Sequence, residues 1–326
     1  MRASTRLGLY GALLVIVFGA AFATAGAVVP REFVESWAQE TEDHEGGHDM
    51  NGDGHSDAGQ GHESSAYGLT LESENYRIAD LSAPAKLGEE GELTLSITGP
   101  DGRTMTDFEL SHEKELHLIV VRSDGAQFRH VHPERDTEGQ WSIPWTWDKG
   151  GSYRVFTEFV PTEAEETITL SSTVQIAGDI DPQTVDAEVT TAKTDDFEVD
   201  VDGELTAGEA SMLTVTVSRD GEPVTTLQPY LGAYGHLVAL REGDLAYLHV
   251  HPHGEEPSPG ETSGPEVAFE VTAPTAGRYL LYLDFQVDGK VHTAELVLDA
   301  KGSGAGASDP SEDDAGHEEG ESHDHD

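Results

Sequence analysis

Residues 115–133 of this 326-residue chain read ELHLIVVRSDGAQFRHVHP, and residues 234–252 read YGHLVALREGDLAYLHVHP. In both stretches an apolar run precedes a two-residue turn, Asp-Gly or Gly-Asp, and a His-x-His-Pro segment follows it. Turns of this kind join antiparallel strands because their twist matches that of the strands. Each stretch therefore predicts a β-hairpin. The recurrence at a constant shift of 119 residues predicts two copies of one domain.

The chain on either side of the hairpins extends this pattern. Segments 92–97, 211–217 and 294–298 alternate apolar and polar residues with a period of two, and no convincing amphipathic helix interrupts them. This pattern predicts an all-β fold of two tandem immunoglobulin-like (Ig-like) antiparallel β-sandwiches. Because a break rich in Asp, Pro and Thr separates the copies, we expect the sandwiches at residues 69–178 and 189–300, joined by a linker at 179–188.

Strand geometry predicts that the histidines of the first hairpin share one face. With the turn at residues 124–125, His117 lies opposite His132, and Ile119 lies opposite His130. Residues two apart point to the same side of a strand, and directly opposed Cβ atoms are about 5 Å apart. Three imidazoles should therefore converge above the first hairpin.

The second hairpin repeats this arrangement, with His236 expected opposite His251 and His249 opposite Val238. Converging imidazoles suit a divalent transition metal such as copper or zinc. The alternative is that these are half-buried strand residues whose ring nitrogens bond to the backbone. The predicted metal ligands are His117, His130 and His132 in the first copy, His236, His249 and His251 in the second, and one carboxylate for each, Glu158 and Asp284.

Composition restricts the chemistry that is open to the chain. It has no cysteine, which excludes disulfides, zinc–thiolate fingers and iron–sulfur clusters. Its 63 acidic residues against 18 basic ones give a net charge of −45, which argues against a nucleic-acid partner and favours cations. Most of this charge falls within residues 71–300, and such an acidic folded body is typical of a halophilic protein.

The two ends of the chain differ from its body. Residues 7–29 are uncharged and follow Arg2 and Arg6, so we expect residues 1–30 to be a signal peptide or a membrane anchor that places the rest outside the cell. Residues 31–68 and 301–326 are acidic, contain histidine and have few large apolar side chains. Both segments are therefore predicted to be disordered, with histidines that hold metal loosely and pass it to the ordered sites.

Three segments of the second copy carry a family resemblance: residues 230–240, 247–252 and 284–289. They resemble a family of exported bacterial and archaeal proteins with two Ig-like repeats. More loosely, each copy resembles the YtkA-like and CopC-like modules of the cell envelope. The resemblance implies an Ig-like sandwich and an association with heavy metals, copper above all.

These observations together predict an exported, cell-surface or extracellular protein that is either membrane-anchored or secreted. We expect it to bind copper or zinc through its three-histidine hairpins, for metal carriage, buffering or sensing, and not to be an enzyme. Its expected partners are metal ions, an envelope metal-handling protein and, if residues 7–29 are uncleaved, the cytoplasmic membrane. The alternative is a structural or adhesive envelope protein with Ig-like modules and no metal role.

Overall fold

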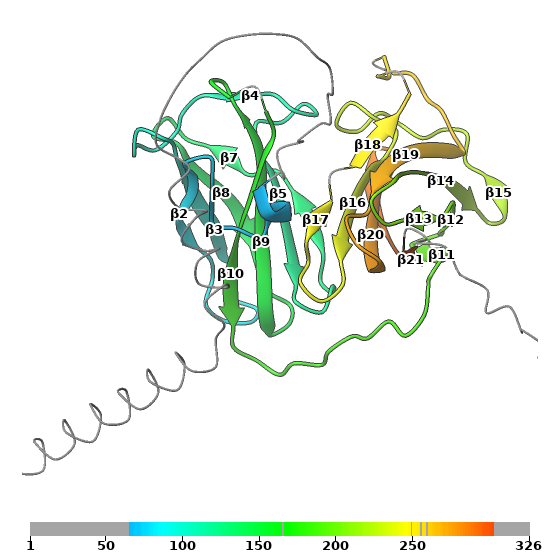
Figure 1. The fold of residues 1–326 in the computed structure, drawn as a ribbon, viewed down its shortest axis with the longest axis horizontal. Coiled ribbons are helices and arrows are strands. Elements are labelled where there is room, and N and C mark those ends of the chain that lie inside the picture. The colour runs from blue at the N-terminus through cyan, green and yellow to red at the C-terminus, as the bar shows by residue number, and fades with distance from the viewer. Residues whose placement is uncertain (1–64, 165, 249, 255, 259, 303–326) are drawn as a thin grey trace, which may run out of the picture. The chain divides into compact units, whose positions relative to one another are not determined.

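The computed structural model describes residues 65–302, except Glu165, His249, Glu255 and Pro259 (Figure 1). The predicted signal or anchor segment 1–30, residues 31–64 and residues 303–326 lie outside the described residues. Within the described part, one 3-10 turn, η1 (Ser65–Gly68), accompanies the strands, and no helix there has the length and apolar character needed to cross a membrane. Two edges of the predicted disordered segments are ordered: η1 itself, and Lys301 at the end of the last strand.

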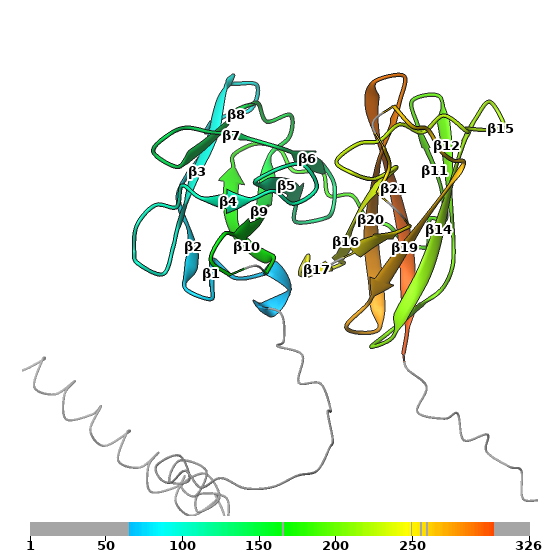
Figure 2. The same ribbon diagram turned by 90° about the horizontal axis from the view of Figure 1, so that it is seen from above.

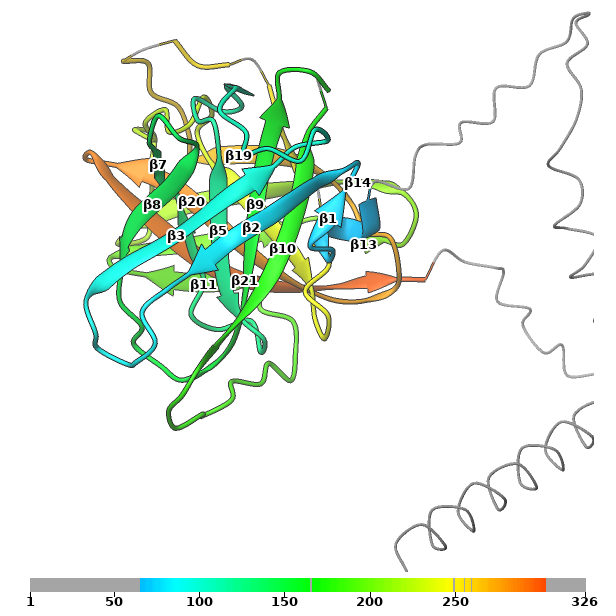
Figure 3. The same ribbon diagram turned by 90° about the vertical axis from the view of Figure 1, so that its left-hand side faces the viewer.

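The first repeat is a sandwich of two antiparallel sheets, seen as layers in Figure 2. Figure 3 turns this repeat toward the viewer, with β2 and β3 in front. One sheet has the order β1 (Glu72–Ser73), β2 (Tyr76–Ser82), β3 (Gly91–Thr98), β8 (Gln140–Trp145) and β7 (Glu134–Arg135). The other has the order β10 (Ile168–Ile176), β9 (Gly151–Pro161), β5 (His117–Arg122) and β6 (Arg129–Val131), and β4 (Phe108–Glu109) also pairs with β9.

The second repeat has the same two-sheet construction. One sheet has the order β11 (Thr191–Thr194), β12 (Phe197–Asp202), β14 (Ala210–Arg219), β19 (Glu266–Thr272) and β18 (Val250–His253), with β15 (Glu222–Pro223) paired to β14. The other has the order β13 (Leu205–Thr206), β21 (Lys290–Lys301), β20 (Gly277–Val287), β16 (His236–Arg241) and β17 (Tyr247–Leu248).

Both repeats have the strand order of an Ig-like sandwich, in which strands A, B, E and D form one sheet and C, F and G form the other. In the first repeat, β2, β3, β8 and β7 correspond to A, B, E and D, and β5, β9 and β10 correspond to C, F and G. The second repeat follows with β12, β14, β19 and β18 in one sheet and β16, β20 and β21 in the other. The predicted fold class is confirmed.

Each sandwich has its own apolar core, and a third cluster joins the two. Leu118 and Val120 of β5 point into the core of the first repeat, as do Trp141 and Trp145 of β8 and Trp147 just after it. The residues between them on β5 point the other way, into a cluster shared with the second repeat. The members of this cluster are Ile119, Val121 and Phe156 from the first repeat and Val238, Leu240, Leu245, Leu280, Tyr282 and Val297 from the second.

The shared cluster packs the outer face of one C-F-G sheet against that of the other. The ring of Phe128 stacks on that of Tyr282 with centroids 3.9 Å apart and planes 5° from parallel. The Phe156 and Tyr247 rings make a second contact, with centroids 5.5 Å apart. Phe128 and Phe156 occupy the repeat-one positions that match Tyr247 and Tyr282, so the two contacts are related by an approximate twofold exchange of the repeats.

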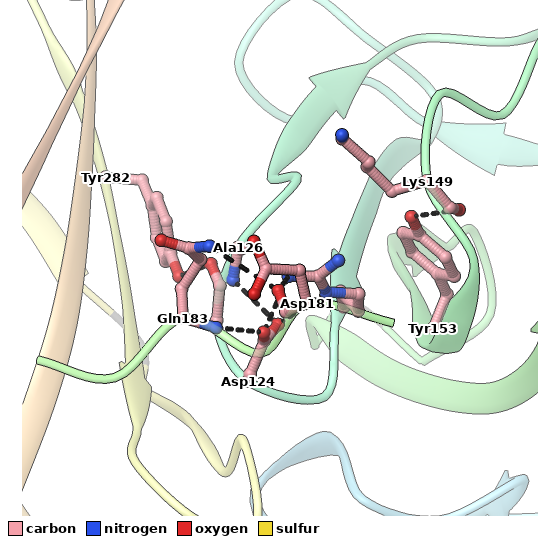
Figure 4. A network of polar contacts seen from close by, with 9 residues as sticks. Asp124, Ala126, Lys149, Tyr153, Asp181, Gln183 and Tyr282 are labelled. Atoms are coloured by element: carbon pink, nitrogen blue, oxygen red, sulfur yellow. Dashed lines mark hydrogen bonds and ion pairs between the residues drawn. The ribbon is translucent and has the colours of Figure 1, made fainter. Parts of the chain in front are cut away.

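Polar contacts fasten the linker and the first hairpin turn to this interface (Figure 4). The backbone N–H of Gln183 donates to Asp124 Oδ2 over 2.8 Å, and Arg122 Nη2 donates to the Asp181 carbonyl oxygen over 3.0 Å. From the second repeat, the Tyr282 hydroxyl donates to the Gly125 carbonyl oxygen over 2.5 Å. Residues 179–188 contain no strand. The hydrogen bonds of Asp181 and Gln183 hold this linker against the turn of the first hairpin.

Candidate metal centre between β5 and β6

The first hairpin forms with the predicted register. Ile119 pairs with His130 and Leu118 pairs with Val131, so the numbers of paired residues are centred on the Asp-Gly turn. His117 is the first residue of β5, and His132 directly follows β6. The alternation of side chains then puts the three imidazoles on one face, because His130 and His132 are two residues apart and His117 lies across from them.

Three ring nitrogens from these residues converge. His117 Nδ1 lies 3.1 Å from His130 Nε2 and 3.1 Å from His132 Nε2. One ligand atom from each of the three residues lies within 4.8 Å of those of the other two. Among the described residues, no other group of three or more His, Asp or Glu side chains brings its ligand atoms this close together.

The outer nitrogens of two of these rings are already engaged as donors. His117 Nε2 lies 2.9 Å from the Ser111 carbonyl oxygen, and His130 Nδ1 lies 2.9 Å from Asp284 Oδ2. A carbonyl or an ionised carboxylate oxygen only accepts hydrogen bonds, so each of these nitrogens carries the proton. In a neutral imidazole the other nitrogen then carries a lone pair. When both rings are neutral, the lone pairs of His117 Nδ1 and His130 Nε2 face one another over 3.1 Å.

This arrangement has the form of a metal site with its supporting contacts. Histidine ligands commonly donate their second N–H to a carboxylate or a backbone carbonyl, which fixes the tautomer and the ring orientation. His117 has the carbonyl partner, and His130 has the carboxylate partner. One proton from His132 can satisfy one of the two short contacts at His117 Nδ1, but a single lone pair cannot serve both.

Burial favours the neutral form of His117 and of His132. His117 is 3% exposed, and the side chain of His130 is 4% exposed. Desolvation lowers the pKa of His117 to about 4 and that of His132 to about 2, since a charged ring is disfavoured away from water and beside other imidazoles. Near neutral pH these two rings are therefore unprotonated, which is the form that ligates a metal ion.

Asp284 lies against the first repeat, although the sequence placed it as a ligand for the second. Its Oδ2 accepts from His130 Nδ1, and its Oδ1 accepts from the Thr293 hydroxyl over 2.5 Å. The carboxylate therefore contacts the far side of the His130 ring rather than the point where the three nitrogens converge. It is 3% exposed and supports the cluster from the second repeat.

Glu158, the predicted fourth ligand of the first copy, is adjacent to the cluster but separate from it. It pairs with His117 across β5 and β9, and its Oε2 accepts a 3.4 Å hydrogen bond from Thr169. With His117, His130 and His236 it lines a small cavity of about 30 Å³. The group of converging ligand atoms found among the described residues contains no carboxylate.

The second hairpin departs from the predicted arrangement after Leu248. Ala239 pairs with Leu248 as the turn predicts, but the chain then enters β18, where His251 pairs with Glu270 of β19 in the opposite sheet. The expected pairing of His236 with His251 was therefore wrong, because β18 forms its ladder with β19. His249 lies outside the described residues.

His236 extends the first cluster instead of forming a second one with described residues. Its Nε2 donates to the Leu231 carbonyl oxygen over 3.0 Å, as His117 Nε2 does to Ser111. Its ring centroid lies 6.4 Å from that of His130, and burial lowers its pKa to about 4. The two equivalent histidines of the repeats thus meet near the same cavity.

Two further histidines have roles that sequence reasoning missed. His112 is exposed, and its ring centroid lies 5.0 Å from that of His236 and 6.1 Å from that of His117. His292 is buried with its ring packed against Phe197 and Phe285, and its Nδ1 donates to Asp195 over 2.7 Å. His292 is a structural residue, since its ring completes the apolar stack and its nitrogen is satisfied.

The fold and the cluster define a protein of two Ig-like repeats with a three-histidine group between β5 and β6. The chain belongs to the family described as a domain of unknown function, DUF8832, whose model matches residues 71–177 and again residues 192–302. This match supports the two-repeat organisation and shows that family rather than a YtkA-like or CopC-like module. A comparison with curated proteins found no match to the chain.

Solved structures with some likeness to the chain come from several kinds of protein. An alpha-2-macroglobulin mutant from Salmonella has 13% identity and a TM-score of 0.21, and the match covers 71% of this chain and 17% of that one. Invasin, titled a bacterial integrin-binding protein, has 12% identity and a TM-score of 0.21, with 70% and 39% covered. The D0–D1 domain of intimin has 15% identity and a TM-score of 0.18, with 70% and 95% covered. Likeness at this level carries no argument about function.

Proposed function

We propose that the protein binds one divalent transition metal ion, Cu²⁺ or Zn²⁺, through His117 Nδ1, His130 Nε2 and His132 Nε2. The observation that carries the proposal is the contact of 3.1 Å between His117 Nδ1 and His130 Nε2, two nitrogens whose partner nitrogens are both committed as donors. A cation between facing lone pairs removes their repulsion and gives each nitrogen a partner.

The spacing of the nitrogens suits such an ion. Two ligands bound at 2.0–2.1 Å in a tetrahedral arrangement lie about 3.3 Å apart, close to the two distances of 3.1 Å at His117. Imidazole nitrogens without thiolate or thioether ligands favour Zn²⁺ or Cu²⁺ over Cu⁺. A fourth position is left for water or for a ligand brought by another molecule. Glu158, which pairs with His117 on the neighbouring strand, lies beside the site.

The proposed role is metal carriage, buffering or sensing outside the cell. It rests on the uncharged run at residues 7–29 behind two arginines, and on acidic, histidine-bearing segments at 31–68 and 301–326 that would raise the local concentration of cations. A single site with three imidazole ligands suits binding and release, and no catalytic residue is assigned to it.

Competitive titration of the full-length chain tests this proposal. Zn²⁺ and Cu²⁺ are titrated in the presence of a chromophoric chelator that outcompetes weak sites, so loosely bound ions at the chain ends remain silent. We expect one ion to be taken from the chelator by the unaltered protein and none by His117→Ala, with His253→Ala as the exposed histidine control.

A different protonation state supplies the opposing result. If His130 were doubly protonated, it would pair with Asp284 and also donate from Nε2 to His117, and no ion would be needed. That state predicts no ion uptake in competition with the chelator, and equal behaviour of the unaltered protein and His117→Ala.

A further inference from the structure

The histidine cluster and the interface between the repeats meet at one residue. His130 belongs to the first repeat, and the carboxylate that holds its Nδ1 belongs to Asp284 of the second, 154 residues later. Both side chains are 4% exposed, so the contact is shielded from water. Asp284 is in turn held by Thr293, its partner across β20 and β21.

We infer that Asp284 is a positioning residue for the metal site of the other repeat, and that ion binding at the histidine cluster and packing of the two sandwiches stabilise each other. This inference rests on the proposed function. It assigns the second repeat a part in a site whose three ligands all lie in the first.

The physical chain of contacts is short. An ion at His130 Nε2 requires the proton of that ring to lie on Nδ1, and Asp284 Oδ2 fixes it there. Ligation draws electron density from the ring and makes its Nδ1–H a better donor to the carboxylate. The hydrogen bond across the interface therefore strengthens when the ion binds, and the ring is oriented for the ion when the repeats are packed.

Linkage makes this relation reciprocal: if packing of the repeats raises the affinity for the ion, the ion raises the stability of the packing by the same factor. The apolar part of the interface, with its stacked Phe128 and Tyr282 rings, holds the repeats together without metal. The ion would then tighten an interface that already exists.

The test compares full-length variants by Zn²⁺ affinity. Removing a residue that supports a metal ligand typically lowers affinity about 10- to 100-fold, so we expect this loss for Asp284→Ala. Asp284→Asn should lose less, because its amide oxygen still accepts from His130 Nδ1. The matched control is Tyr282→Phe, which removes another hydrogen bond between the repeats, to Gly125, and leaves the histidines untouched.

Two further measurements separate positioning from general loosening. In a His130→Ala background, Asp284→Ala should cause no additional loss of affinity, since the ring it orients is absent. In hydrogen exchange, Zn²⁺ should increase the protection of β20 amides in the unaltered protein and not in Asp284→Ala.

Three results would overturn the inference: unaltered Zn²⁺ affinity in Asp284→Ala, an equal loss in Tyr282→Phe, or full Zn²⁺-induced protection of β20 without the carboxylate. Each can occur while the unaltered protein still binds Zn²⁺, which leaves the proposed function standing. Absence of Zn²⁺ binding to the unaltered protein would instead contradict the proposed function itself.

Discussion

His117 and His130 bring two ring nitrogens within 3.1 Å of one another while each uses its other nitrogen as a donor. An ordinary contact between two histidines has one donor and one acceptor. Here the backbone carbonyl of Ser111 and the carboxylate of Asp284 place the protons on the outer nitrogens, so that neutral rings present two acceptors to one another. This contact is the basis for the expectation that a metal ion binds between the two rings.

A bound ion should stabilise the fold. Zn²⁺ at about 100 times its dissociation constant should raise the free energy of unfolding by about 2.7 kcal/mol at 25 °C, because it binds the folded chain and not the unfolded one. If residues 31–68 and 301–326 are disordered as predicted, their histidines bind the ion equally in the folded and unfolded chain and add nothing to the difference. Denaturant titration with Zn²⁺ or with a chelator measures the difference, which His132→Ala should remove and His253→Ala should retain. An equal gain in His132→Ala would place the stabilising ion elsewhere.

Without metal, the protein should lose stability as the pH falls from about 6.5 toward 4. Burial lowers the pKa of His236 to about 4 in the folded chain, against 6.5 for an ordinary histidine. In that window the unfolded chain binds more protons, so stability is fully present above pH 6.5 and is lost on acidification. The limiting slope is about 1.4 kcal/mol per pH unit for each such histidine.

Denaturant midpoints measured in chelator between pH 7.5 and 4.5 check this dependence. His236→Gln should reduce the slope because it removes one group with a lowered pKa, whatever it does to stability at neutral pH. His253→Ala serves as the control for loss of an exposed histidine. A slope that is the same in all three proteins would contradict the assignment.

Alanine should cost more stability at Gly125 than at Gly102, a glycine in an open turn. Its φ of +84° and that of Gly102, +76°, both disfavour a side chain by about 1–2 kcal/mol. A Cβ on Gly125 would also clash with Leu280 Cδ1 of the second repeat, whereas a Cβ on Gly102 meets nothing within 4 Å. Overpacking of this kind typically adds about 1–3 kcal/mol.

Equilibrium unfolding of Gly125→Ala and Gly102→Ala gives this difference directly. The excess loss in Gly125→Ala reports the contact between the repeats, since the two variants share the backbone penalty. Equal losses would show that the first hairpin turn does not press on Leu280 in solution.

Much of the fold could be predicted because its signals are local. The period-two alternation gave the strands, and the Asp-Gly turn gave the pairing of Ile119 with His130. The shift of 119 residues gave the duplication, and the same local geometry placed His117, His130 and His132 together. Each of these depends on residues that are close in sequence or on strands joined by one short turn.

The packing of the repeats against each other has no such local signal. Asp284 was assigned to its own repeat because equivalence between copies says nothing about which surface each copy buries. One clue was present: residues 118–121 are apolar without alternation, which indicates a strand covered on both faces. The position of His251 also depends on tertiary packing, because its strand, β18, pairs with β19 of the other sheet and not with β16.

The most direct measurement is nitrogen NMR of the full-length protein labelled with ¹⁵N in its imidazole rings, recorded with and without Zn²⁺. The account predicts that Nδ1 of His117 and Nε2 of His130 and His132 take the shift of a metal-bound nitrogen, while His117 Nε2 and His130 Nδ1 stay protonated. Spectra in which these three nitrogens do not respond to Zn²⁺, or in which the response is confined to histidines of residues 31–68 and 301–326, would contradict the account.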